Sequence, residues 1–185
     1  MREVVLGFPT VEDYAKKDRT YLGALVGRVA NCTGKGEFEL NGETYKLTIN
    51  NGLNTLHGDL EGFSYKIFDY KIRKEEVLFH YVSPDGEENF SGNLDFYTSY
   101  KLLENGLQIR YHATSDKDII INITNHSYFN ISGKPCNIDE HELMIKADYM
   151  ACVDNDGLAS GEIREVKGTP FDFNDEKLIK DNIYK

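Results

Sequence analysis

The 185-residue sequence predicts an all-β protein, built as an antiparallel β-sandwich or barrel. Three observations lead to this prediction. Apolar residues recur with a period of two along most of the chain, tight-turn dipeptides separate the alternating segments, and a single short stretch carries a helical signal. Because no repeat and no Pro- or Ser-rich linker divides the sequence, we expect one domain over residues 1–185.

The helical signal covers residues 10–17. Thr10 can accept a hydrogen bond from a backbone N–H in the first turn, and Asp13, three residues later, can bond back to the backbone of Thr10. The segment is short, so we expect at most one short helix, near the N-terminus.

The clearest β-hairpin lies around Asn41-Gly42. Apolar residues occupy every second position on both sides of this dipeptide, at Phe38, Leu40, Tyr45, Leu47 and Ile49. Asn-Gly between two alternating runs is the strongest short-range hairpin signal, and it predicts a type I′ turn with a positive φ at both residues.

Further strands follow the same alternation. They are expected at residues 65–67, 77–81, 96–102 and 107–113. Pro84-Asp85-Gly86 indicates a turn between the second and third of these strands, and Asn105-Gly106 indicates a turn between the third and fourth. The continuous run of isoleucines at 119–121 is typical of a strand buried on both faces.

Composition and charge narrow the functional classes. With 40% apolar residues, twelve Tyr and ten Phe, the chain can form a real core, burying about 70% of the surface that its unfolded form exposes. Its formal net charge of −10 is offset by no local Lys/Arg cluster, which disfavours nucleic acids and anionic membranes as partners. A neutral or cationic ligand fits this charge better.

The three cysteines, Cys32, Cys136 and Cys152, are odd in number and lack CxxC spacing, so the sequence indicates neither a disulfide framework nor a zinc site. We expect reduced, mostly buried thiols. No charged-then-apolar leader opens the sequence, and no apolar run reaches the roughly 18 residues of a membrane helix. We therefore expect a cytoplasmic protein.

Clustered polar residues and glycines interrupt the alternation in three segments. They are GRVANCTGKG (27–36), INNGLNTLHGD (49–59) and NITNHSYFNIS (122–132). Loops of this kind on a rigid β scaffold commonly carry functional residues. Two of them hold a histidine, His57 or His126, although a single histidine is more often structural than catalytic. We interpret His80 and His112, inside strand patterns, and His141, in an acidic loop, as structural.

Short runs spread along nearly the whole chain share the order and spacing of one known family. They are GRVAN (27–31), INNGLNTLHG (49–58), TNHSYFNISG (124–133) and GTPFDF (168–173), joined by VVLGF near the start and ASGEI at 159–163. Together these runs resemble the aldose 1-epimerases, also called galactose mutarotases.

This resemblance implies an antiparallel β-sandwich of the galactose mutarotase type with an open sugar-binding cleft. It also implies the interconversion of the α and β anomers of a free hexose, galactose or glucose, in hexose metabolism, with no metal and no organic cofactor. A proton must reach the ring oxygen while another leaves the anomeric hydroxyl, so one general acid and one general base are sufficient.

Residue roles carry over by motif. His126 in TNHSYFN corresponds to the family's catalytic acid, which protonates the ring oxygen, and His57 in NTLHG corresponds to a second histidine that binds the sugar. Asn31 in GRVAN corresponds to an asparagine that hydrogen-bonds sugar hydroxyls. Tyr128 is expected beside the pocket, where a flat aromatic face suits the C–H face of a pyranose. The chemistry agrees, because an imidazole titrates near neutrality and can donate and recover a proton at working pH.

One departure from the family concerns binding. Cys32 stands where the family has a second arginine that reaches the sugar, whereas Arg28, the first arginine of the motif, is present and is expected to be structural. Losing a charge-assisted hydrogen bond costs on the order of 1.5–3 kcal/mol. We therefore expect weakened sugar affinity.

A second departure concerns catalysis. Family members are much longer, and their glutamate base, together with an aspartate and a glutamine that contact the sugar, lies in a C-terminal half without counterpart in this sequence. A positioned base contributes about 10²–10⁴-fold to the rate. We therefore expect little activity from this polypeptide alone.

A partial sandwich also has consequences for association. It leaves unpaired strand edges and an apolar face without its covering sheet. We expect this chain to self-associate or to pair with a second polypeptide that completes the sandwich.

Two alternatives to the epimerase are considered. One is a non-catalytic carbohydrate-binding or interaction module that kept the cleft walls and lost the base. The other is a glycoside hydrolase, which needs two carboxylates flanking the scissile bond. The polar segments offer histidines and amides instead, which disfavours the hydrolase.

Overall fold

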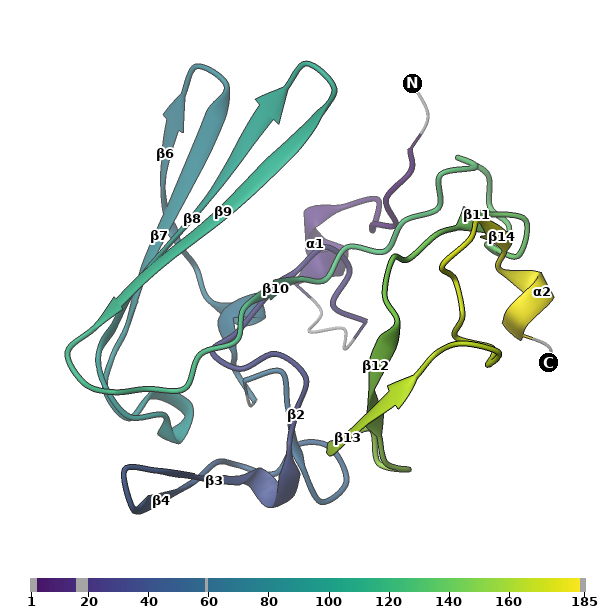
Figure 1. The fold of residues 1–185 in the computed structure, drawn as a ribbon. Coiled ribbons are helices and arrows are strands. Elements are labelled where there is room, and N and C mark those ends of the chain that lie inside the picture. Colours follow the sequence, from purple (N-terminus) through teal and green to yellow (C-terminus); the bar gives the residue numbers. More distant parts are fainter. Residues whose placement is uncertain (1–2, 16–19, 59, 184–185) are drawn as a thin grey trace. The chain divides into compact units, whose positions relative to one another are not determined.

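Strands are the main regular secondary structure of the protein, as Figure 1 shows for a computed structural model that describes residues 3–15, 20–58 and 60–183. The helices are short, and all pairs of named strands in the described residues are antiparallel. The prediction of an antiparallel all-β fold is confirmed. The expectation of at most one short helix, near the N-terminus, is wrong, because a second short helix, α2 (Lys180–Ile183), lies near the end of the described residues. None of the described helices is long and apolar enough to cross a membrane.

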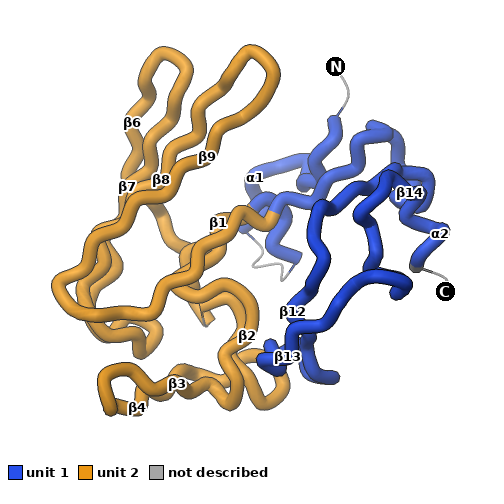
Figure 2. Tube along the Cα trace, viewed as in Figure 1, with its two compact units in different colours: residues 1–23, 127–185 blue, residues 24–126 orange. Residues whose placement is uncertain are grey.

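The chain divides into two compact units (Figure 2). Unit 2 contains residues 24–126, and unit 1 contains residues 1–23 together with 127–185. The expectation of one domain over the whole chain stays a prediction.

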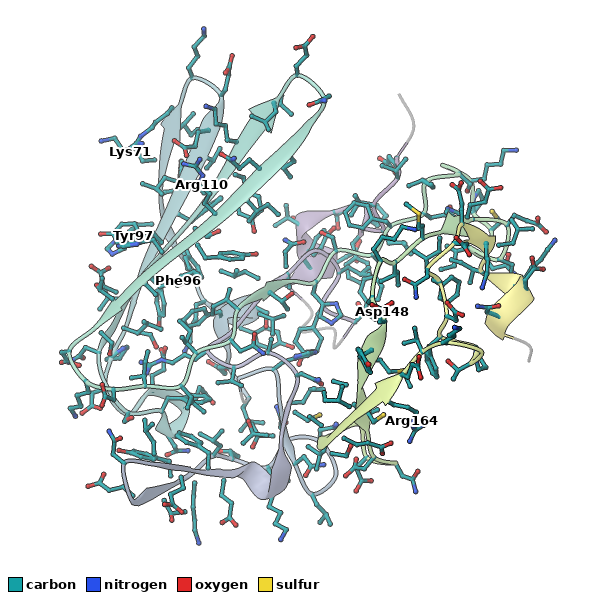
Figure 3. All side chains as sticks on the ribbon, in the orientation of Figure 1. Lys71, Phe96, Tyr97, Arg110, Asp148 and Arg164 are labelled. Carbon is teal, nitrogen blue, oxygen red and sulfur yellow. The ribbon has the colours of Figure 1, made fainter. Side chains whose placement is uncertain are left out.

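The main element of unit 2 is a four-stranded antiparallel sheet in the order β6-β7-β8-β9. Its strands are β6 (Asp69–Arg73), β7 (Glu76–Ser83), β8 (Leu94–Leu103) and β9 (Gly106–Ser115). The strands predicted at residues 77–81, 96–102 and 107–113 are confirmed as parts of β7, β8 and β9. Because side chains alternate along a strand, consecutive residues such as Phe96 and Tyr97 project from opposite faces of this sheet (Figure 3).

The turn predicted at Pro84-Asp85-Gly86 is confirmed, because the backbone N–H of Glu87 donates to the carbonyl of Pro84 at 3.0 Å. The turn predicted at Asn105-Gly106 is shifted by one residue. Leu103 pairs with Gly106, so Glu104 and Asn105 form the tight turn and Gly106 already belongs to β9. Between β7 and β8 the chain makes a longer loop over residues 84–93, which contains a 3-10 turn, η3 (Glu87–Asn89).

Two predicted strands are wrong. Residues 63–65 form a 3-10 turn, η2 (Phe63–Tyr65), and Ile67 is 93% exposed, because Phe63 is drawn into the core and the sheet begins only at Asp69. Residues 119–121 are not a strand either. Ile119 packs against the core but Ile121 is largely exposed, so the isoleucine run is buried on one side at most.

The predicted hairpin at Asn41-Gly42 is confirmed, with β3 (Glu37–Leu40) paired to β4 (Glu43–Lys46). Both turn residues have the positive φ that a type I′ turn requires, 54° for Asn41 and 79° for Gly42. The strand ends earlier than the alternation predicted, at Lys46.

The polar segments of unit 2 are held in position by short pairs of strands. They are β1 (Leu25–Val26) with β10 (Thr124–Asn125), and β2 (Cys32–Thr33) with β5 (Thr55–Leu56), with a 3-10 turn η1 (Gly34–Gly36) after β2. The core beneath them is formed by Phe63, Leu94 and Phe96, against which Ile119 and Ile123 pack.

Unit 1 contains smaller elements. They are α1 (Val11–Tyr14), β11 (Glu142–Leu143) paired with β14 (Lys177–Leu178), β12 (Tyr149–Val153) paired with β13 (Ala159–Glu165), and α2 (Lys180–Ile183). The predicted N-cap of α1 is confirmed, because Thr10 Oγ1 accepts from the backbone N–H of Asp13 at 3.3 Å. The Asp13 carboxylate accepts from the Thr10 hydroxyl at 2.8 Å, rather than from its backbone. Residues 16 and 17 of the predicted helix lie outside the described residues.

The cysteines differ from the expectation of mostly buried thiols. Cys152 is buried, whereas Cys32 is half-buried and Cys136 is exposed. All three are free thiols. The prediction of mostly buried side chains is therefore wrong, since Cys32 lies in a two-residue strand at a sheet edge and Cys136 lies in a loop.

Candidate functional site

The imidazole rings of His57 and His126 meet within unit 2, although they come from polar segments far apart in the sequence. Their centroids lie 5.1 Å apart, and their planes are inclined at 81°. His57 directly follows β5, and His126 directly follows β10. Two short strand ends thus bring together the two histidines that the sequence selected.

Asn31 and His57 extend the ladder between β2 and β5. After the pairs Thr33 with Thr55 and Cys32 with Leu56, the backbone N–H of His57 donates to the carbonyl of Asn31 at 3.1 Å. In the other direction the backbone N–H of Asn31 donates to Nδ1 of the His57 ring at 3.0 Å. The His57 side chain therefore takes the place of a backbone acceptor.

Both residues of this pair have left-handed backbone conformations, with φ 67° for Asn31 and 59° for His57. Such conformations cost about 1–3 kcal/mol for residues other than glycine, although Asn and His adopt them more readily than most. They turn the backbone so that the ring of His57 faces back to the N–H of Asn31. The backbone of His57 is held by the β2–β5 ladder on its N-terminal side and by the following residue on its C-terminal side.

That next residue is Gly58, with φ 83°. A Cβ atom at this position would overlap the carbonyl oxygen of Gly27. Gly27 itself has no room for a side chain, because a Cβ there would lie 2.5 Å from Cδ1 of Ile123 and 2.8 Å from Cδ2 of Phe63. Close backbone packing between the segments of Gly27 and Gly58 explains a glycine in each.

His126 is fixed by the pairing of β1 with β10. Its backbone N–H donates to the carbonyl of Ala24 at 2.9 Å, continuing the ladder past the pair of Leu25 with Asn125. The side-chain amide of Asn125 donates to the hydroxyl of Tyr100 on β8 at 3.4 Å. Tyr100 is a supporting residue that the sequence did not reveal, because it lies in a regular alternating strand.

The surroundings of His57 change its pKa. Burial lowers the pKa of His57, and the nearby ring of His126 lowers it further. His57 is therefore neutral at neutral pH. A neutral imidazole offers one N–H donor and one nitrogen acceptor, whereas a protonated imidazole can give up its proton, so two rings side by side can supply a hydrogen-bond donor beside a proton donor.

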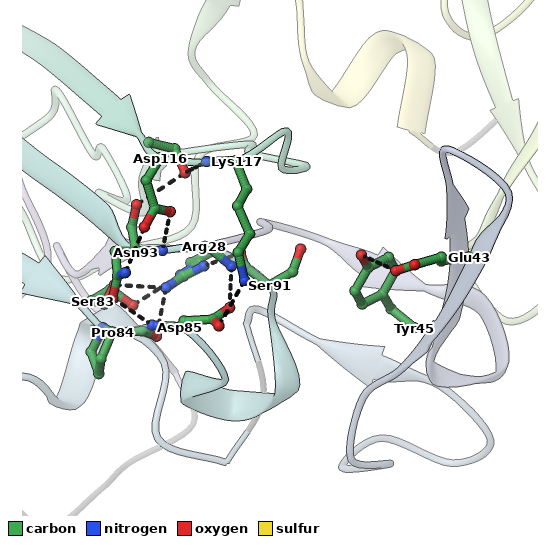
Figure 4. A network of polar contacts seen from close by, with 12 residues as sticks. Arg28, Glu43, Tyr45, Ser83, Pro84, Asp85, Ser91, Asn93, Asp116 and Lys117 are labelled. Atoms are coloured by element: carbon green, nitrogen blue, oxygen red, sulfur yellow. Dashed lines mark hydrogen bonds and ion pairs between the residues drawn. The ribbon is translucent and has the colours of Figure 1, made fainter.

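Arg28 bonds to the loop between β7 and β8, in agreement with its expected structural role. It is 2% exposed, and its guanidinium donates to Ser83 Oγ, to the carbonyls of Ser83 and Pro84, and to the carbonyl of Ser91, at 2.8–3.0 Å (Figure 4). These bonds secure the loop between β7 and β8. The hydroxyl of Ser83 in turn donates to Glu87.

The other predicted site residues are distributed as follows. The Asn31 residue is exposed at the end of β2, next to the histidine pair. Tyr128 belongs to unit 1, where its carbonyl accepts from the backbone N–H of Leu6 at 2.9 Å and the residue is 42% exposed. The structure thus brings together His57, His126 and Asn31, and the role of Tyr128 beside the pocket stays a prediction.

The remaining histidines occupy other places. His80 lies in β7, with Nε2 2.6 Å from Asp95 Oδ1 and its ring stacked on Tyr97. His112 is exposed in β9, and His141 precedes β11 in unit 1. Within the described ranges no group of three or more His, Cys, Asp or Glu residues is arranged to hold a metal ion.

A cavity of about 1000 Å³ lies in unit 1. It is lined by residues 3–8 and 133–137 with Leu22 and Asn130, and none of the five histidines contributes to it. We base the candidate site on the histidine pair, because an imidazole can both donate and recover a proton near neutral pH.

Comparison with known proteins identifies the family of this chain. The family model for aldose 1-epimerase matches residues 1–185. Galactose mutarotase from Bos taurus is 45% identical over 171 residues, which are 92% of this chain and 50% of that protein. Aldose 1-epimerase from Escherichia coli is 38% identical over 181 residues, 97% of this chain and 52% of that protein. The chain thus spans about half the length of these curated relatives.

Solved structures agree in fold. A GalM/aldose epimerase homologue from C. elegans matches with a TM-score of 0.92 and 33% identity, over 97% of this chain and 55% of the other. Galactose 1-epimerase from Lactobacillus acidophilus matches with a TM-score of 0.90 and 34% identity, over 100% of this chain and 55% of the other. The predicted galactose mutarotase type of β-sandwich is confirmed, and the chain belongs to the aldose 1-epimerase family.

Proposed function

We propose that this chain carries the acid side of an aldose 1-epimerase that interconverts the α and β anomers of free galactose or glucose. The observation that carries the proposal is the pair of imidazole rings of His57 and His126, 5.1 Å apart, in the two motifs that correspond to the family's histidines. We also propose a cytoplasmic location, which suits three free thiols.

The proposed reaction begins with proton transfer from His126 to the ring oxygen of the sugar. The bond between C1 and the ring oxygen breaks as a base removes the proton of the anomeric hydroxyl, which leaves an open-chain aldehyde and a new hydroxyl. Rotation about the C1–C2 bond presents the other face of the aldehyde. Closure then reverses the steps, and His126 recovers its proton.

The other site residues bind the sugar in this proposal. His57 donates a hydrogen bond near the ring oxygen, and the Asn31 side chain bonds to sugar hydroxyls. Tyr128 offers an aromatic face to the C–H face of the pyranose. Cys32 supplies no charge at the position of the family's second arginine, so the affinity is weak.

The residues named above supply no general base for this reaction. The family's glutamate has no counterpart in the matched sequence, and a positioned base contributes about 10²–10⁴-fold. This polypeptide alone is therefore a slow catalyst, and addition of a chain that supplies the carboxylate raises its rate.

Polarimetry tests the proposal. Freshly dissolved α-glucose or α-galactose approaches anomeric equilibrium faster with the protein than in buffer, and His126→Gln removes the difference. His112→Gln, a matched change of an exposed histidine on β9, keeps the rate. A rate unaffected by His126→Gln would refute the assignment of the acid.

A non-catalytic carbohydrate-binding or interaction module is the second candidate. It is favoured by Cys32 at the arginine position. Calorimetric titration with galactose separates the two candidates, because a module binds the sugar without accelerating the approach to equilibrium.

We also propose that the chain associates through one face of the sheet β6-β7-β8-β9. The face that buries Phe96 at one end continues along the same strands to large apolar residues that are exposed. They are Tyr70 (69% exposed), Ile72 (70%), Leu102 (66%) and Leu107 (58%). A second β-sheet, from another copy or from a second polypeptide that completes the sandwich, would cover them.

Sedimentation tests this association. Alone, the protein forms dimers or larger species at micromolar concentration, and a polypeptide completing the sandwich converts them to a one-to-one complex. A clean monomer under these conditions contradicts the proposal.

A further inference from the structure

The bond between the backbone of Asn31 and the ring of His57 determines where the proton of His57 resides. In a neutral imidazole one nitrogen is a donor and the other is an acceptor. The N–H of Asn31 donates to Nδ1 at 3.0 Å, so Nδ1 must present its lone pair. The ring proton is therefore on Nε2.

The donor in this bond is a backbone group that cannot rotate away. Asn31 is tied to His57 a second time, by the N–H of His57 at 3.1 Å from its carbonyl, at the end of the β2–β5 ladder. On the other side of His57, the backbone contact between Gly58 and Gly27 leaves no room for adjustment. The ring is thus held against a fixed N–H.

The same geometry opposes protonation of His57. A protonated ring has an N–H at both nitrogens, and its Nδ1–H would face the N–H of Asn31. Burial and the neighbouring ring of His126 also lower the pKa of His57, so three influences act in one direction. Since the two centroids are 5.1 Å apart, a proton on His126 further disfavours one on His57.

We infer that the backbone of Asn31 is a positioning group that keeps His57 as the neutral Nε2–H tautomer, so that His57 acts only as a hydrogen-bond donor and His126 alone exchanges protons. This inference rests on the proposed function for the sugar as the acceptor. A neutral donor suits an uncharged sugar oxygen, and it leaves the proton on the ring that must deliver it.

Nitrogen NMR of the full chain tests the inference without turnover. The two-bond ¹H–¹⁵N pattern of a ¹⁵N-histidine sample distinguishes the Nε2–H tautomer, the Nδ1–H tautomer and the protonated ring, and His57→Gln assigns the signals. We expect a pure Nε2–H pattern for His57 at neutral pH, with a protonation midpoint below the ordinary histidine value of about 6.5. An Nδ1–H pattern or a rapidly exchanging mixture overturns the inference.

Two changes at position 31 separate the backbone from the side chain. Asn31→Gly keeps the N–H and suits the positive φ, so the His57 pattern is retained even though sugar contacts are lost. A semisynthetic chain with an ester in place of the amide between Ala30 and Asn31 removes the donor and keeps the Ala30 carbonyl as a weaker acceptor for the Asn122 side chain, and a mixture of tautomers is expected. An unchanged pure Nε2–H pattern in the ester chain shows that Asn31 does not set the tautomer.

A third comparison uses the sugar. A Gln side chain can mimic the Nε2–H donor of histidine, whereas an Asn side chain mimics only the Nδ1 acceptor. We expect His57→Gln to retain more galactose affinity than His57→Asn in calorimetry, and the reverse order contradicts donation from Nε2. The NMR pattern is measured without sugar, so the two possible failures can be distinguished. If the proposed function is wrong, the protein neither binds nor converts the sugar, but His57 is still the pure Nε2–H tautomer. If the inference is wrong, His57 is a mixture of tautomers.

Discussion

The ring of His57 lies edge-on to the ring of His126, 5.1 Å away, and burial together with this neighbour lowers the pKa of His57. In the unfolded chain an exposed histidine titrates near about pH 6.5. Below that pH the unfolded chain binds the proton that the folded chain resists, so His57 makes the fold less stable as the pH falls toward its lowered pKa. Above about pH 7.5 both states are neutral and His57 contributes no pH dependence.

Urea denaturation at pH values on either side of about 6.5 measures this effect. We expect His57→Gln to lose less free energy of unfolding on acidification than the wild type. His112→Gln, which changes an exposed histidine in the same unit, retains the wild-type difference. Equal acid sensitivity in the wild type and His57→Gln counts against a neutral His57.

Gly58 supports the position of His57. Its replacement by alanine, compared with a control, separates the cost of a positive φ from the cost of overlap between the new Cβ and the carbonyl of Gly27. Gly58→Ala introduces a Cβ at φ 83° that overlaps the carbonyl of Gly27. Gly86→Ala is a matched control, because Gly86 has φ 84° and nothing within 4 Å of the added Cβ. The control loses about 1–2 kcal/mol for the left-handed conformation alone.

The free energy of unfolding from urea denaturation compares the two glycine variants. We expect Gly58→Ala to lose clearly more than Gly86→Ala and to shift the NMR signals of His57. Equal losses would show that the backbones at Gly58 and Gly27 can separate at no cost, and that the ring of His57 does not depend on this contact.

The antiparallel sheet could be predicted from the sequence because one face of β7, β8 and β9 is apolar. Apolar residues therefore recur at every second position along these strands. The strand at 119–121 could not be judged in the same way. Ile119 to Ile121 are apolar without alternation, and the structure uses Ile119 and Ile123 as separate core contacts from an irregular segment. A short apolar run does not determine secondary structure by itself.

The sequence motifs predicted which residues belong to the candidate site, but they did not predict the hydrogen bonds that position them. His57, His126 and Asn31 stand in recognisable strings, but the bond from the Asn31 backbone to Nδ1 depends on two left-handed residues at a strand end. Neither residue is glycine, so the residue types alone do not predict a positive φ at these two positions. Likewise, Tyr100 supports Asn125 from a regular strand in which every second residue is apolar or aromatic.

Arg28 stabilises unit 2 through geometry as well as through its charge. Arg28→Lys keeps the charge, but a lysine cannot reach the four acceptors that the guanidinium bonds, namely Ser83 Oγ and the carbonyls of Ser83, Pro84 and Ser91. Leaving buried acceptors unsatisfied costs about 1–3 kcal/mol. Thermal denaturation should show this loss, whereas Arg110→Lys, on the exposed part of β9, stays near the wild type. Equal stability of the two variants contradicts a structural role of the Arg28 hydrogen bonds.

Cys32→Arg restores the side chain expected at this position of the motif. Cys32 is half-buried in β2, next to Asn31 in the sequence and paired with Leu56. A charge-assisted hydrogen bond to a sugar oxygen contributes about 1.5–3 kcal/mol, so galactose or glucose binding should tighten by roughly 10- to 100-fold in calorimetry. Cys136→Arg makes the same change at an exposed cysteine of unit 1 and leaves the affinity unaltered. An affinity that Cys32→Arg does not change speaks against placing the sugar beside β2.

The exposed apolar face of the sheet gives the last prediction. Leu107 pairs with Leu102 on this face, whereas its neighbour Gln108 pairs with Lys101 on the opposite face. Leu107→Lys places a charge among apolar side chains that a covering sheet would have to bury, which costs several kcal/mol for an unpaired ion. Gln108→Lys adds the same charge to the same strand on the polar face. In sedimentation velocity, Leu107→Lys should shift the protein toward the monomer while Gln108→Lys sediments like the wild type, and equal effects of both variants would show that the added charge, rather than the face that carries it, controls association.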